Sequence, residues 1–109
     1  MRTATFVRGW RNPYGTDVSI YELTPIYVDP VTMMTHRYIA ILARGAYPID
    51  VYPTKPTGLK RCHVTPDYTH GRIRTYGRDK YQAMASIGVT HTRWVDGFGR
   101  PWEGKIRLK

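Results

Sequence analysis

The sequence predicts a single α+β domain, residues 1–109, in which a mostly antiparallel sheet of about six short strands is partly covered by one helix. Three observations lead to this prediction. The chain has 109 residues, the length of one domain, and its eight prolines and ten glycines are scattered rather than gathered in a linker. They divide the chain into short segments rich in β-branched and aromatic residues, which is typical of strands. Only residues 79–88 have a convincing helical pattern.

The first three strands are expected at Thr3–Arg8, Val18–Val28 and His36–Ala43. Between the first two, proline and glycine of Asn12-Pro13-Tyr14-Gly15 suit the second and fourth positions of a turn. Pro25 lacks the N–H that a ladder requires, so the second strand either ends near Thr24 or runs along an edge. The unbroken apolar run within the third strand indicates a central strand covered on both faces.

The middle of the chain predicts shorter elements. A strand at Ile49–Tyr52 is expected to end at a rigid loop that begins with Pro53-Thr54-Lys55-Pro56 and closes at Gly58. Further extended chain is expected at Arg61–Val64 and Gly71–Tyr76.

The helix is predicted to begin after Asp79, whose carboxylate can cap the free N–H groups of the first turn. Gln82, three residues later, is placed to reach back as in a capping box. Gly88 suits the left-handed conformation that ends a helix. Two strands follow, Val89–Val95 and Trp102–Leu108, joined at Asp96-Gly97-Phe98-Gly99, which is a hairpin signal.

Charge and composition limit the classes of partner and the cellular location that we expect. The chain carries 17 Lys and Arg against 8 Asp and Glu, a formal net charge of +9, and this excess favours an acidic partner. No apolar run is long enough for a spanning helix and no secretory signal is recognisable, so we expect a cytoplasmic protein without a membrane partner. The lone cysteine, Cys62, excludes an intramolecular disulfide framework.

The most suggestive stretch for binding begins at Gly71. In extended conformation, alternate side chains would project from one face, which suits phosphate contacts by arginine and base stacking by tyrosine. The alternative is the solvated face of an amphipathic strand, and arginine-rich coding composition could account for part of the charge. The candidate nucleic-acid-binding residues are Arg72, Arg74, Tyr76, Arg78 and Lys80.

The predicted C-terminal hairpin offers a second class of function. Trp and Arg dominate protein–protein hot spots, so Trp94, Phe98, Arg100 and Trp102 are candidates for contacting a partner protein. The alternative is that these rings close the ends of a thin core. Exposure of the aromatic patch would separate the two interpretations.

Catalysis and metal binding receive little support. The four histidines, His36, His63, His70 and His91, form no metal-binding motif, and Cys62 and His63 would point to opposite faces of a strand. A small metal-independent ribonuclease is the third hypothesis; it requires a histidine and arginines to converge on one pocket. We predict no catalytic residue, no metal and no cofactor.

The segment Thr35-His36-Arg37-Tyr38-Ile39, the following strand, the polar break, the short helix ending at Gly88 and the strand from Val89 resemble small accessory proteins of actinobacterial bacteriophages. This resemblance transfers no site residue. It implies a viral accessory protein in the host cytoplasm that binds nucleic acid or occupies a host protein. We therefore expect a non-enzymatic protein, monomeric or homodimeric, whose partner is nucleic acid or, alternatively, a host protein that it inhibits.

Overall fold

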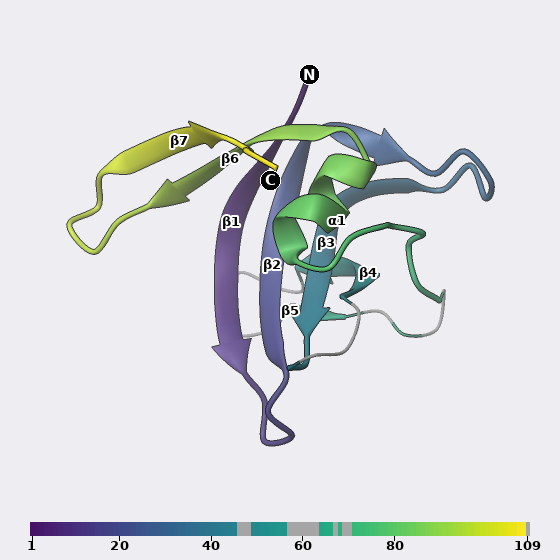
Figure 1. Ribbon diagram of the computed structural model, residues 1–109, viewed down its shortest axis with the longest axis horizontal. Helices are drawn as coiled ribbons and strands as arrows, with labels where there is room; N and C mark the ends of the chain where they lie inside the picture. The colour runs from purple at the N-terminus through teal and green to yellow at the C-terminus, as the bar shows by residue number, and fades with distance from the viewer. Residues whose placement is uncertain (46–48, 57–63, 67, 69–70, 109) are drawn as a thin grey trace.

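The computed structural model describes residues 1–45, 49–56, 64–66, 68 and 71–108 (Figure 1). The described chain forms seven strands and one helix. Within the described residues no helix has the length and apolar character needed to cross a membrane. The elements are β1 (Arg2–Arg11), β2 (Asp17–Val28), β3 (Thr35–Ala43), β4 (Asp50–Pro56), β5 (Val64–Pro66), α1 (Lys80–Ser86), β6 (Val89–Val95) and β7 (Pro101–Lys105).

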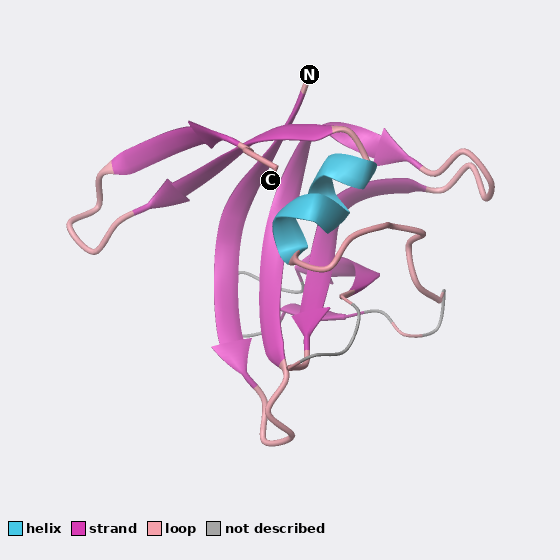
Figure 2. Ribbon diagram, in the orientation of Figure 1, coloured by secondary structure: helices cyan, strands magenta, loops and turns pink. Residues whose placement is uncertain are grey.

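All seven strands belong to one sheet, in the order β5-β4-β3-β2-β1-β6-β7. Every pairing is antiparallel except that of β1 with β6, which is parallel. The sheet curves around α1, which covers one face, and β6 and β7 extend from the body as an arm (Figures 1 and 2). The predicted α+β class is confirmed, and Val64–Pro66 adds a short strand at one edge.

Apolar side chains pack on both faces of the sheet. On the face away from the helix, Val18, Ile20 and Ala40 are buried, with Trp10 and Leu42 packed against them. Because Ala40 faces this cluster while its neighbours Ile39 and Ile41 face the helix side, β3 is covered on both faces, as predicted. The helix-side cluster consists of Ala4, Tyr21, Leu23, Ile39, Ile41, Val51, Ile73, Ala83, Met84, Ile87 and Val89.

Pro25 lies where both ladders of β2 are disturbed, although β2 itself continues to Val28. Pairing with β1 stops at Thr24, whereas pairing with β3 resumes at Tyr27 after a shift in register. The strand does not end near Thr24, so the first of the two expected alternatives was wrong. The second agrees with the end of β2, because β2 is central in the sheet but pairs on one side only beyond Thr24. The guanidinium group of Arg2 compensates by donating to the carbonyl oxygens of Pro25 and Ile26, at 3.0 and 3.3 Å.

Two predictions for the middle of the chain also need correction. Residues Pro53 to Pro56 continue β4 instead of opening a loop, because they pair with β3 on one side and β5 on the other. Gly71–Tyr76 forms no strand: a backbone hydrogen bond joins it to the sheet, from the Ile73 N–H to the Val51 carbonyl at 2.7 Å, and a single bond of this kind is not a ladder. Of the expected segment Arg61–Val64, only Val64 lies within the described residues.

The helix begins and ends as predicted. The Asp79 carboxylate accepts a hydrogen bond from the Gln82 N–H at 2.8 Å. Gln82 reaches back one residue further than in a standard capping box, accepting from the Arg78 N–H at 2.8 Å. Gly88 has φ of 86°, the left-handed conformation expected after a helix.

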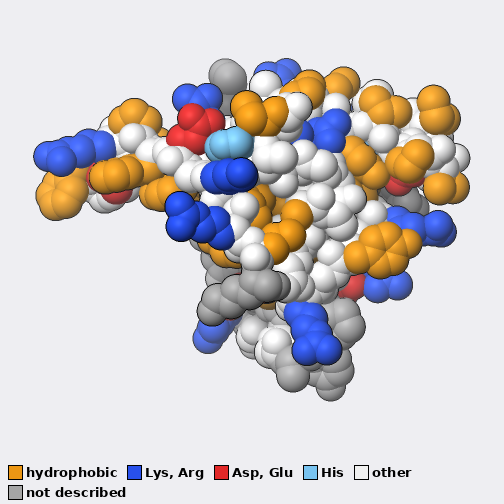
Figure 3. All heavy atoms as spheres, turned by 45° about the horizontal axis from the view of Figure 1, so that its top comes forward, with side chains coloured by type: hydrophobic (Ala, Val, Ile, Leu, Met, Phe, Trp, Pro, Cys, Tyr) orange, Lys and Arg blue, Asp and Glu red, His pale blue; other side chains and the backbone are white. Residues whose placement is uncertain are grey.

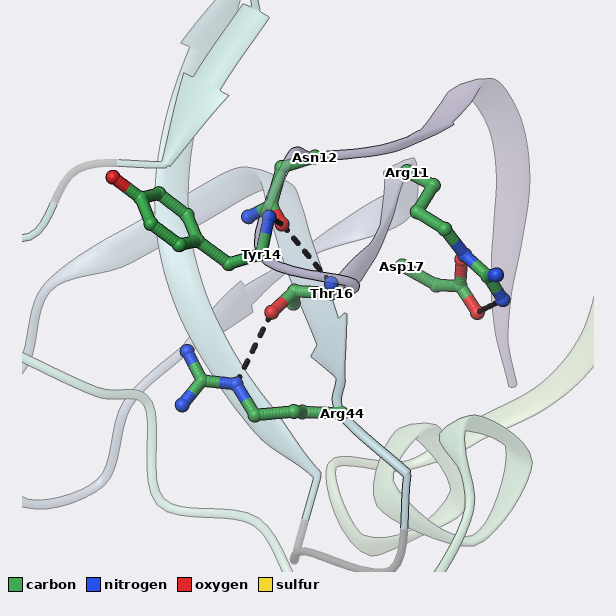
Figure 4. A network of polar contacts seen from close by, with 6 residues as sticks. All are labelled: Arg11, Asn12, Tyr14, Thr16, Asp17 and Arg44. Atoms are coloured by element: carbon green, nitrogen blue, oxygen red, sulfur yellow. Dashed lines mark hydrogen bonds and ion pairs between the residues drawn. The ribbon is translucent and has the colours of Figure 1, made fainter.

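The predicted turn between β1 and β2 is also confirmed (Figure 4). The Asn12 side chain accepts from the N–H groups of Tyr14 and Thr16, both at 3.0 Å, and the Gly15 N–H donates to the Asn12 carbonyl. Buried Thr16 accepts from Arg44 at 3.2 Å, and so joins this turn to the end of β3.

Candidate nucleic-acid interface

A cleft of about 510 Å³ opens between the start of α1 and the arm formed by β6 and β7. Aromatic and cationic side chains dominate its lining, and no aspartate or glutamate of the described chain lines it. The lining residues are Phe6, Tyr21, Lys80, Tyr81, Thr92, Arg93, Trp94, Gly104, Lys105, Ile106 and Arg107.

Strand pairing brings these residues together from distant parts of the sequence. Phe6 of β1 lies opposite Tyr21 of β2, and their rings meet edge to face with centroids 5.6 Å apart. The parallel pairing of β1 with β6 places Thr92 beside Ala4. Since α1 immediately precedes β6, its first residues lie at the same end of the cleft.

The cations of the cleft are available to an anion. None of Lys80, Arg93, Lys105 and Arg107 forms an ion pair with another described residue. Lys80 Nζ lies 5.9 Å from the Tyr21 ring centroid and 5.3 Å from that of Tyr81, so the ammonium sits among aromatic rings. Such contacts orient the cation without neutralising it.

Tyr21 is the buried polar group of the cleft. Its side chain is only 4% exposed, and this burial raises the pKa of its hydroxyl, although the Lys80 cation acts in the opposite direction. The hydroxyl therefore remains protonated at neutral pH. Thr92, 9% exposed, adds a second hydroxyl-bearing side chain to the lining.

The arm presents aromatic rings to solvent. Trp94 and Trp102 are partners across the hairpin and are 39% and 51% exposed, while Phe98 in the turn is 87% exposed. The interpretation that these rings close a thin core is therefore wrong. Arg100 lies over the Phe98 ring, 5.8 Å from its centroid. Figure 3 shows hydrophobic and cationic side chains side by side along the arm, with further cations where it joins the body.

Asp96 organises the turn of the arm. Its carboxylate accepts from the Trp102 indole N–H at 2.8 Å and from the backbone N–H groups of Phe98 and Arg100 at 2.8 and 2.9 Å. These hydrogen bonds lower the pKa of the Asp96 carboxyl, the bond from Trp102 most of all. The carboxylate is thereby turned inward on the hairpin.

The predicted basic stretch ran from Gly71 to Lys80, and its first eight residues, 71–78, lie outside the cleft. These eight residues follow the β5 region in the chain and lead into α1, and they are held by hydrogen bonds from the Tyr76 N–H to Ser86 and from the Arg78 N–H to Gln82. Arg72 pairs with Asp50 at 2.8 Å, which raises the pKa of its guanidinium group. We call residues 71–78 the connecting stretch.

The five predicted residues of this stretch and the helix start are therefore divided. Arg74 is exposed and its charge helps to lower the pKa of Asp29. Tyr76 is 71% exposed and Arg78 is exposed, but neither lines the cleft. Lys80 does line the cleft, and so does Trp94 of the predicted aromatic hairpin. Lys80 is therefore the one predicted basic residue that shares the cleft with a residue of that hairpin.

The described histidines do not enter the cleft. His36 is buried and stacks on Tyr27, with ring centroids 6.2 Å apart, and this burial lowers its pKa. His91 bonds its neighbour Thr90 at 2.8 Å. His63, His70 and Cys62 lie outside the described residues. Among the residues that are described, no three of His, Cys, Asp and Glu are grouped so that they could hold a metal ion.

Sequence reasoning missed the aromatic half of the cleft. Phe6, Tyr21 and Tyr81 belong to three different elements, and no local pattern links them. Arg93, Lys105 and Arg107 were recognisable only as part of a general excess of positive charge.

Comparison of the chain with protein-family models, with curated proteins and with solved structures finds no match. Any functional conclusion must therefore come from the geometry and chemistry of the cleft and the arm.

Proposed function

We propose that this protein binds nucleic acid through the cleft and the adjoining arm. The observation that carries the proposal is the composition of the cleft, in which four cations and four aromatic rings line one recess and no carboxylate of the described residues does. Lysine and arginine neutralise phosphates, and aromatic rings stack on bases. The net charge of +9 would add long-range attraction.

The lining of the cleft fits a small anion less well than it fits a nucleic acid. A phosphate or carboxylate alone would use the cations and leave the rings of Phe6, Tyr81 and Trp94 without a role. A polymer that alternates phosphates with flat bases uses both components. The proposal keeps the expected context of a small phage-type accessory protein acting in the host cytoplasm, without catalysis.

The test is fluorescence anisotropy of labelled single-stranded and duplex DNA and RNA, repeated over a series of salt concentrations. If all four cleft cations contact phosphates of a single strand, the logarithm of the affinity should fall against the logarithm of salt with a slope of about −2.8. Absence of binding near physiological salt contradicts the proposal. A gel of the same mixtures tests for cleavage, which would favour the ribonuclease hypothesis.

A second candidate function rests on the exposure of the arm. Trp94, Phe98 and Trp102 form an exposed aromatic surface with Arg100, the composition of a protein-binding hot spot. If the protein instead occupies a host protein, a pull-down from host lysate should retain one partner that is lost with Phe98→Ala. Nucleic-acid binding would then be weak and insensitive to that change.

A further inference from the structure

The cleft is recessed, and its parts differ in depth. Tyr21 and Thr92 are almost fully buried and so form its bottom, whereas Tyr81 and Trp94 are 43% and 39% exposed and so stand at its rim. Tyr81 comes from the helix and Trp94 from the arm. A flat ligand that enters between them would meet apolar and hydroxyl-bearing side chains below it.

On the arm side of the cleft, Gly104 leaves room for the Trp94 ring to pack against the backbone of β7. A Cβ atom at this position would lie 3.4 Å from the Trp94 ring, so the indole rests against the bare backbone of β7. Gly104 is the register partner of Thr92, which places the supported ring directly beside the bottom of the cleft. A large ring fixed against a strand is a suitable stacking platform.

Cationic residues line the cleft on both sides of this position. Lys80 stands on the helix side beside the Tyr21 and Tyr81 rings, and Arg93, Lys105 and Arg107 belong to the lining on the arm side. The register places Arg93 beside Thr5 and Lys105 opposite His91, so their side chains leave the strands on the face opposite to that of Thr92. The volume of about 510 Å³ lies within the range of small-ligand pockets, about 300–1,000 Å³. The cleft thus combines room for one flat aromatic group with charge for the phosphate attached to it.

We propose that the cleft accepts one unstacked base together with its phosphate, and that the protein therefore prefers single strands to duplexes. This inference rests on the proposed function and adds a specific ligand to it. A base within a duplex has both faces covered by its neighbours, and extracting it requires the loss of pairing and stacking. A base in a single strand enters at much smaller cost, so a recessed aromatic site discriminates between the two forms.

The experiment is competition against a labelled single-stranded oligonucleotide bound to the full chain. The competitors are the four nucleoside 5′-monophosphates, the corresponding nucleosides, and inorganic phosphate at matched ionic strength. The monophosphates should displace the oligonucleotide, the nucleosides should do so more weakly because they lack the charge, and inorganic phosphate should have no effect beyond that of salt. Duplex of the same sequence should bind at least about tenfold more weakly than the single strand.

Two variants assign the effect to the cleft. Trp94→Leu, which keeps an apolar side chain without a ring, should lower oligonucleotide affinity about tenfold and abolish competition by monophosphates. Trp94→Phe should largely restore both. Trp102→Leu is the comparison variant, since Trp102 is the partner of Trp94 on the arm but does not line the cleft. Because Trp102 belongs to the arm surface and its indole bonds Asp96, a smaller loss is expected from Trp102→Leu, and only a loss equal to that of Trp94→Leu counts against the cleft. Far-ultraviolet circular dichroism verifies that each variant is folded.

The outcomes separate this inference from the proposed function. Oligonucleotide binding without competition by monophosphates, or with equal affinity for duplex, overturns the base site while leaving nucleic-acid binding intact. Equal losses from Trp94→Leu and Trp102→Leu also overturn it, because they assign the binding to the arm surface. Absence of binding to any oligonucleotide overturns both.

Discussion

The connecting stretch and the cleft are both rich in cations and aromatic rings, yet the two regions differ in what their side chains are free to do. In the connecting stretch, Arg72 is paired with Asp50. Arg74 helps to lower the pKa of Asp29 by its charge, as Lys80 of the cleft does for Asp17, so the ion pair of Arg72 is what distinguishes the two regions. In the cleft, four cationic residues belong to the lining and none forms an ion pair with another described residue.

The two regions also differ in the hydrogen bonds of their backbone. The connecting stretch is held by hydrogen bonds from Ile73, Tyr76 and Arg78 to β4 and α1, so it joins the sheet to the helix. The cleft is built by strands that pair within the sheet and by the first residues of α1. A dense charge pattern in the sequence therefore belongs to a structural connection here, whereas cationic residues dispersed in the sequence line the cleft.

The largest expected effect tests the structural role of the connecting stretch. Gly77 has φ of 149°, and a Cβ there would lie 2.4 Å from Cβ of Gln82 and 2.8 Å from the Ala83 nitrogen. Gly77→Ala should lower the free energy of unfolding by about 3 kcal/mol, through backbone strain and overlap with the helix. Chemical denaturation measures it.

Gly97→Ala is the matched control, because a Cβ atom on Gly97 would meet nothing within 4 Å and the φ of Gly97 is not positive. Its effect should be close to zero. Equal stability of wild type and Gly77→Ala would show that the connecting stretch is not held against the helix.

The second prediction compares the two cationic regions directly. Lys105→Ala with Arg107→Ala should weaken single-strand binding about tenfold near physiological salt and reduce the salt slope by about 1.4, which is the expectation for two lost phosphate contacts. Arg72→Ala with Arg74→Ala removes the same charge from the connecting stretch. Because Arg72 is already paired with Asp50, this double variant should reduce the slope by less.

Anisotropy titrations of both double variants across the same salt series decide the comparison. If the Arg72 and Arg74 pair proves the more damaging, the site predicted from the sequence is correct and the cleft is secondary. If both pairs leave affinity unchanged, none of these four side chains contacts phosphate.

The third prediction concerns the helix start, where the two regions meet. Asp79→Ala removes the cap on the Gln82 N–H and should cost about 1 kcal/mol of stability. Because Lys80 and Tyr81 follow directly and line the cleft, oligonucleotide affinity should fall as well. Asp79→Asn, which retains a capping oxygen, should recover most of both quantities. Loss of stability with unchanged affinity would separate the cap from the cleft.

A smaller effect is expected at the ion pair between Arg72 and Asp50. Both side chains are substantially exposed, so replacing Arg72 by Ala should change the free energy of unfolding only slightly. A double-mutant cycle with Asp50→Ala measures the coupling. A coupling well above the usual range for exposed pairs, up to about 1 kcal/mol, would mean that the pair, and not the backbone, anchors the connecting stretch.

The smallest effect is a pH dependence of the arm. The pKa of Asp96 is lowered in the folded protein from an ordinary value of 3.8, so its hydrogen bonds contribute stability above that value. The contribution is lost as the pH falls from 3.8 through the lowered folded value. Trp102 fluorescence should change in that range, and Asp96→Asn should remove the transition. A transition that persists in Asp96→Asn would assign it to another carboxyl group.

Local signals in the sequence were sufficient for much of the fold. The Asn12 turn, the Asp79 cap and the Gly88 terminus each depend on residues a few positions apart, and all three were predicted correctly. The apolar run in β3 predicted burial on both faces because a half-exposed strand would alternate. The sequence left open whether β2 ends near Thr24 or continues past Pro25 along an edge, and the pairing of Tyr27 and Val28 with β3 decides for continuation.

For the candidate site, too, some features follow from the sequence and others only from the tertiary structure. The sequence by itself determined the positive charge, the α+β class, and the aromatic hairpin, because these follow from composition and local pattern. Only the tertiary structure decided which cationic residues are paired with a carboxylate and which belong to the lining of the cleft, because Arg72 meets Asp50 and Phe6 meets Tyr21 from separate elements. The parallel pairing of β1 with β6 closes the cleft, and it joins residues more than 80 positions apart, a distance that no local pattern spans.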